Sequence, residues 1–66
     1  MWTVVYIAPS KLIAEKYKDI LTEEGMLVQL HPIGSVHLRD HASVEILVLE
    51  SEAEEAHEII TGVRGL

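Results

Sequence analysis

The residues of this chain best suited to bind a metal ion lie close together near its middle. His31, His37 and His41 fall within eleven residues, and Asp40 stands beside the last of them. Neutral imidazole and carboxylate groups are ligands for zinc and similar divalent ions. The spacing of His37 and His41 carries most meaning on a helix, but this segment lacks a helical pattern, and solvated loop histidines are common. A metal site at His37 and His41 is therefore the alternative hypothesis, and no cofactor is expected.

Other candidate chemistry has a simpler structural explanation. Ser10 and Lys11 stand at the expected start of a helix, where backbone N–H groups attract anions, although the same residues form an ordinary cap. The chain has no cysteine nucleophile, and its serines have no recognisable pairing with histidine and aspartate. A chain of 66 residues also has little room for a water-excluding pocket. We therefore expect that the protein is not an enzyme.

Composition sets the broad class of the protein. Sixty-six residues predict a single domain, residues 1–66, with marginal stability when alone. Without cysteine, disulfides cannot add stability, so self-association is the remaining common solution. A net charge of −6 argues against partners such as nucleic acid or an anionic membrane surface. The amino-terminal sequence has neither a basic leader nor a long apolar run, so we expect a cytoplasmic protein.

Hydrophobic patterning predicts three strands and two helices. The most apolar run, Val44–Leu49, is typical of a buried strand. The expected elements, in chain order, are a strand at Trp2–Ala8, a helix at Lys11–Glu24, a strand at Met26–His31, a loop at Ile33–Ser43, the strand Val44–Leu49 and a helix that begins after Ser51.

Capping residues mark the helix ends. Ser10 is expected to cap the first helix, and Gly25 to end it in a left-handed conformation. Ser51 and Glu54 form a capping-box pattern before the second helix. Its predicted buried stripe comprises Ala53, Ala56, Ile59 or Ile60, and Val63. Gly62 and Gly65 are expected to mark where this helix stops.

This order of elements predicts an α+β fold of the ferredoxin-like βαββα type. A right-handed crossover leaves room for the third strand between the first two. The expected sheet has three strands in the order 1-3-2, with two helices on one face. Trp2–Ala8 would then be an uncovered edge strand without a charged residue, which proteins normally avoid.

Strand alternation divides the strand residues between the two faces of this sheet. The set expected to face the helices is Val5, Ile7, Val28, Leu30, Val44, Ile46 and Val48. The opposite set is Trp2, Val4, Tyr6, Leu27, Gln29, His31, Glu45, Leu47 and Leu49. Such an apolar face is rarely left in water. It predicts a homo-oligomer formed through this face or through the free edge, or else a ligand or another protein that covers the face. Trp2, Tyr6, His31 and Leu47 are the expected ligand or partner surface.

The opening WTVVYIAPS, the helix pattern of Ala14, Glu15, Lys18 and Leu21, and the acid-rich Glu45–Ile60 resemble a small prokaryotic family of signal-transducing proteins, a domain of unknown function. The resemblance covers roughly Met1–Ile60. This family is grouped with PII-like regulators, which carry a signalling loop between their second and third strands. The corresponding loop here, Ile33–Ser43, is shorter than that loop and contains no tyrosine. The resemblance implies a bacterial signalling role, and no family functional residue matches as a motif.

The sequence thus favours a regulatory or protein-interaction module that acts as a homo-oligomer. The alternative is a metal-binding or small-ligand-binding sensor that uses the histidines of Ile33–Ser43. A subunit that accompanies an enzyme is a third, more distant hypothesis.

Overall fold

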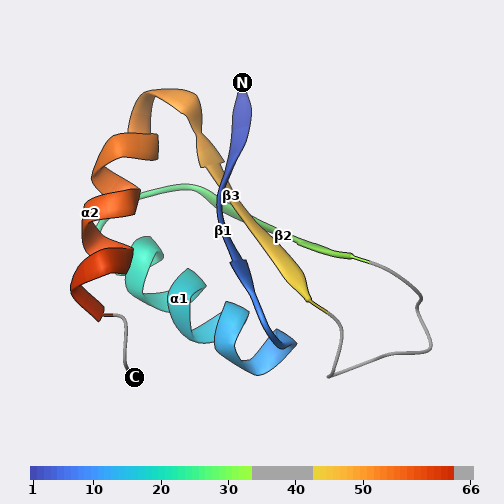
Figure 1. Ribbon diagram of the computed structural model, residues 1–66. Coiled ribbons are helices and arrows are strands. Elements are labelled where there is room, and N and C mark those ends of the chain that lie inside the picture. Colours follow the sequence, from blue (N-terminus) through green and yellow to red (C-terminus); the bar gives the residue numbers. More distant parts are fainter. Residues whose placement is uncertain (34–42, 64–66) are drawn as a thin grey trace.

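The structure, a computed structural model, describes residues 1–33 and 43–63. Its elements follow the chain as β1 (Trp2–Ala8), α1 (Lys11–Glu23), β2 (Val28–Pro32), β3 (Val44–Leu49), the short 3-10 turn η2 (Glu50–Glu52) and α2 (Ala53–Val63) (Figure 1). The predicted order of strands and helices is confirmed. The second strand begins two residues later than expected, because Met26 still belongs to the turn that closes α1.

The three strands form one sheet in the order β1-β3-β2, and β3 runs antiparallel to both neighbours. Both helices pack on the same face of this sheet (Figure 1). This arrangement confirms the ferredoxin-like βαββα prediction. Among the described residues β1 pairs with β3 alone, so it is an edge strand, as the sequence predicted.

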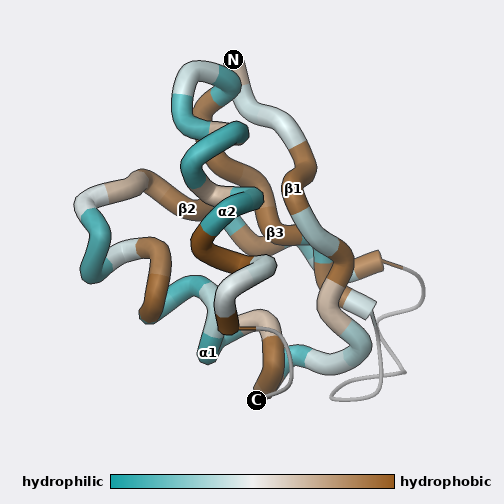
Figure 2. The backbone as a smooth tube through the Cα atoms, turned by 60° about the vertical axis from the view of Figure 1, so that its left-hand side comes forward, coloured by the Kyte–Doolittle hydropathy of each residue, from teal (hydrophilic) through white to brown (hydrophobic). Residues whose placement is uncertain are grey.

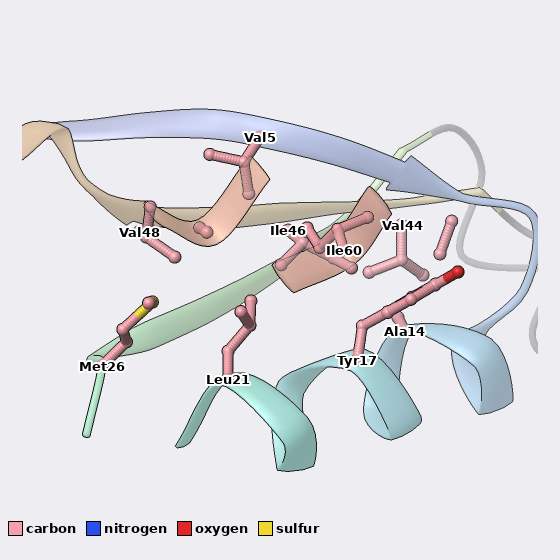
Figure 3. Packing of buried hydrophobic residues seen from close by; sticks show 11 residues of the cluster. Val5, Ala14, Tyr17, Leu21, Met26, Val44, Ile46, Val48 and Ile60 are labelled. Atoms are coloured by element: carbon pink, nitrogen blue, oxygen red, sulfur yellow. The ribbon is translucent and has the colours of Figure 1, made fainter. Parts of the chain in front are cut away.

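The helix-facing side of β3 forms the centre of the core. Val44, Ile46 and Val48 alternate along the strand and are almost completely buried. Figure 3 shows them above α1, with Tyr17 and Leu21 of that helix pointing toward them. Ala56 and Ile60 of α2 complete the same cluster, as the helical spacing predicted. At about 25 cal/mol per Å² of apolar area, this burial is the main source of stability.

The ends of α1 are closed as its sequence predicts. The Ser10 side chain accepts a hydrogen bond from the Ile13 N–H at 3.3 Å. At the other end Gly25 has φ +91°, and the Met26 N–H donates to the Leu21 carbonyl at 3.2 Å. The left-handed Gly25 and the bond from Met26 turn the chain back toward the sheet and place Met26 in the core.

The start of α2 differs from the prediction. Ser51 does not cap the helix, because it lies inside η2, and α2 begins at Ala53. The backbone explains the difference: the Glu50 N–H donates to the Met1 carbonyl at 2.7 Å, which extends the pairing of β1 with β3 and delays the helix by a short turn. Gly62 lies within α2 rather than after it, and Gly65 lies outside the described residues.

A bulge in β1 changes which side chains face the core. Val4 pairs with Leu47, and Tyr6 pairs with the next residue of β3, Ile46, so Val5 is an extra residue in the strand. The expected alternation is therefore wrong from this point on. Tyr6 packs against the core, whereas Ile7, predicted to be buried, is 52% exposed. An extra residue reverses the phase of a strand whose side chains alternate every second position.

The two described glycines give a matched test of backbone conformation. Neither would bring an added Cβ within 4 Å of another atom, but only Gly25 has a positive φ. We expect Gly25→Ala to lower the free energy of unfolding by about 1–2 kcal/mol through strain. Gly62→Ala, within α2, should raise it by up to about 1 kcal/mol. Urea unfolding at one fixed protein concentration measures both, and changes of the same sign in the two variants would contradict the assignment.

Candidate interaction surface

The sheet surface that faces away from the helices is called the open face below. The register places eight strand residues on it: Trp2, Val4 and Ile7 of β1; Glu45, Leu47 and Leu49 of β3; and Gln29 and His31 of β2. Leu27 and Ile33 flank β2 at its two ends. In the part of the chain that the structure describes, both helices pack on the opposite face. None of the described helices covers the open face, which is therefore a candidate surface for binding.

Large apolar side chains are exposed along β1. Trp2 is 36% exposed, Val4 40% and Ile7 52%, and all three lie on the open face. Figure 2 shows brown, hydrophobic stretches within β1. Leu47, in the middle of the open face, is only 9% exposed, because it stands between Val4 and Gln29 on the neighbouring strands. The apolar surface offered to a partner thus comes chiefly from β1.

One cross-strand row of the open face is polar. Glu45 of β3 lies between Ile7 of β1 and His31 of β2. The His31 ring nitrogen Nε2 lies 3.1 Å from the amide oxygen Oε1 of Gln29, at hydrogen-bond distance. Glu45 is the only Asp, Glu, Lys or Arg in the three strands. The polar strand residues of the open face therefore lie on β2 and at Glu45, whereas its β1 residues are all apolar.

The backbone groups of β3 alternate between its two neighbours, and two hydrogen bonds fix their direction. The Glu50 N–H donates to the Met1 carbonyl at 2.7 Å, beside β1, and the Ser43 carbonyl accepts from the Ile33 N–H at 2.8 Å, beside β2. In an antiparallel ladder the direction changes with every residue. Even-numbered residues of β3 therefore bond toward β1, and odd-numbered residues bond toward β2.

The same alternation shows which groups of β1 remain at the free edge. Trp2, Val4 and Ile7 are the three residues of β1 that pair with odd-numbered residues of β3. Their N–H and C=O groups consequently point away from β3, toward the edge of the sheet. These three residues therefore combine an exposed apolar side chain with a free backbone donor and acceptor.

Most of the contact residues predicted from the sequence lie on the open face, with one correction. Trp2, His31 and Leu47 are there, although Leu47 contributes little surface. Tyr6 is not: the bulge turns it toward α1, where its ring meets Tyr17 edge-on with centroids 5.1 Å apart. Ile7 takes the expected place of Tyr6. Nothing in the run Val4-Val5 distinguishes a bulge from a regular strand, so the sequence carries no signal for this exchange.

The predicted metal ligands cannot be placed. His37, His41 and their neighbour Asp40 lie outside the described residues. Within residues 1–33 and 43–63, no group of three or more His, Asp or Glu side chains is arranged to hold a metal ion. None of the helices described for this chain is long and apolar enough to cross a membrane.

The helix layer carries most of the described charge. From Glu50 to Val63 the chain contains five glutamates and no lysine or arginine. This acidic stretch appears in teal along the first turns of α2 in Figure 2. Since α2 packs on β1 and β3, its negative charge lies on the helix-covered face, over the part of the sheet that includes the edge strand β1.

Comparison with known proteins found no match among protein-family models, curated proteins or solved structures.

The position of Tyr6 is testable through its contact with Tyr17. A double-mutant cycle with Tyr6→Leu and Tyr17→Leu should give a coupling free energy of about 0.5–1.5 kcal/mol, the usual value for an edge-on aromatic pair. Urea unfolding of the wild type, both single variants and the double variant supplies the four values. Because the cycle subtracts the other contacts of each ring, additive single effects would show that Tyr6 points away from α1.

Proposed function

We propose that this chain is a regulatory protein-interaction module that acts as a homo-oligomer, with the open face and the β1 edge as its working surface. The observation that carries the proposal is the exposure of Trp2, Val4 and Ile7 on an edge strand without a charged residue. Sheet edges that stay single are usually blunted by charged side chains, by proline or by a bulge that twists the edge away. β1 has no charged residue and no proline, and its one bulge, at Val5, leaves Trp2, Val4 and Ile7 exposed, whereas the opposite edge strand, β2, ends in Pro32.

Size supports the same proposal. A chain of 66 residues without disulfides buries only about 60% of the surface of its extended form. Pairing with a second copy would remove further apolar surface from water, at about 25 cal/mol per Å². Self-association thus provides stability that a small core alone lacks.

The regulatory part of the proposal draws on the sequence resemblance to small prokaryotic signal-transducing proteins. A surface made of backbone groups and apolar side chains suits protein contacts better than chemistry on a small molecule. We place this activity in the bacterial cytoplasm, in keeping with the absence of cysteine. A role as a sensor through His37 and His41 would require residues that lie outside the described part of the chain.

The proposal predicts a mass above that of the monomer at tens of micromolar in light scattering or sedimentation. Val4→Lys should weaken self-association by roughly tenfold or more, since lysine at an edge opposes strand pairing. Leu12→Lys is the matched control: Leu12 is 63% exposed, but it lies on α1, and the same charge is added. A monomeric wild type, or equal effects of the two variants, would contradict the proposal.

A further inference from the structure

Two copies of this chain can meet through the open face or through the β1 edge, and the position of Glu45 distinguishes these arrangements. Glu45 is half-buried in the central strand, with side chains of β1 and β2 on either side. Stacking two open faces would bury its carboxylate, and removing a charge from water without a partner costs several kcal/mol.

Stacking about a two-fold axis centred on the middle of β3 does not relieve this cost. Two-fold stacking with the axis along the strands sets Glu45 over Glu45 of the second copy. With the axis across the strands, Glu45 lies over Leu49 of the second copy instead. Neither arrangement provides the carboxylate with a positive partner from β3, whose other residues are all aliphatic. Edge pairing, in contrast, leaves Glu45 in solvent.

The residues at the free edge are spaced for pairing with themselves. Trp2, Val4 and Ile7 pair with Leu49, Leu47 and Glu45, which are two residues apart along β3. Because Val5 is an extra residue, Trp2 and Ile7 each lie two ladder positions from Val4, one on either side of it. Val4 stands at the midpoint of the three residues whose backbone groups are free.

We propose that two copies pair antiparallel through β1 about a two-fold axis at Val4, which joins their sheets into one of six strands. This inference rests on the proposed function and specifies how the self-association is made. Val4 lies opposite Val4 of the second copy, and Trp2 lies opposite Ile7 of the second copy. Three residues on each strand, each donating and accepting once, give about six main-chain hydrogen bonds.

Side chains reinforce this register. Opposite residues of paired strands lie on the same face, so each Trp2 ring packs beside an Ile7 side chain of the second copy. Aromatic residues opposite β-branched residues are among the favourable cross-strand pairs. The two central valines fill the space between these pairs. The exposed apolar side chains of β1 thereby form one continuous row across the joined open faces.

The acidic helices set a condition on this pairing. The α2 helices pack above the β1 strands, so joining the edges brings two glutamate-rich helices to the same side of the joined sheet. Each copy also has a net charge of −6. Salt screens such repulsion over about 10 Å at 0.1 M. Raising the sodium chloride concentration should therefore tighten the pair.

Cysteine cross-linking tests the register, and the absence of native cysteine makes it unambiguous. Hydrogen-bonded opposite residues have Cα atoms about 5.5 Å apart, within the range of about 4.4–6.8 Å that a disulfide spans. Val4→Cys should form a disulfide-linked dimer under mild oxidation. A mixture of Trp2→Cys and Ile7→Cys should form the mixed disulfide, whereas Trp2→Cys alone should not, because its two Cα atoms would be about 14 Å apart. Leu12→Cys is the exposed control.

The outcomes separate the register from self-association itself. Native mass above the monomer together with the Val4 and mixed Trp2–Ile7 cross-links would support the pairing. The same mass without these cross-links, or with a Trp2→Cys homodimer as the main product, would overturn the β1 register and leave self-association standing. A monomeric wild type at tens of micromolar, in both low and high salt, would overturn the proposed function as well.

Discussion

The structure depends on the burial of β3 between two strands and beneath two helices. Its side chains are aliphatic at every position except Glu45, so the strand is stable only where both of its faces and both of its edges have neighbours. β1 and β2 cover the edges, and α1 and α2 cover one face. The side chains of the flanking strands partly cover the other face, which is why Leu47 is nearly buried there without a helix above it.

The arrangement that buries β3 leaves β1 at an exposed edge of the sheet. A three-stranded sheet with its most apolar strand in the centre must have two edges, and here one edge consists of aromatic and β-branched residues without a charge. The strand that completes the core on one side thus presents free backbone groups at the edge of the sheet on its other side. A further strand at this position would pair with these groups, and under the proposed dimer a second copy would supply that strand.

Periodicity and capping were sufficient to predict the fold. The apolar run Val44–Leu49 indicated the central strand, and Ser10 and Gly25 marked the ends of α1 through physical requirements that hold in any context. The start of α2 was predicted less well, because the hydrogen bond from Glu50 to Met1 joins residues at distant positions in the sequence. Local capping rules cannot anticipate such a bond.

The sequence predicted most of the residues on the open face, but it did not predict the bulge that exchanges Tyr6 with Ile7. Alternation placed Trp2, Val4, His31 and Leu47 on the correct face, since each precedes the bulge or lies on a regular strand. The exchange of Tyr6 with Ile7 arises from one extra residue whose position depends on packing: a buried Val5 and a Tyr6 ring against Tyr17 favour the bulged strand. Two valines in succession are compatible with either form, so the sequence alone leaves the phase undetermined.

The hydrogen bond between the Ile33 N–H and the Ser43 carbonyl has a consequence for how such a domain could diversify. It holds the two flanks of residues 34–42 one strand spacing apart, independently of the amino acids between them. Loop closure costs only about 0.6 kcal/mol more for each doubling of loop length. Insertions or replacements between these two anchors would therefore leave the sheet and its free edge unchanged, and the same scaffold could accept sequences of different length there.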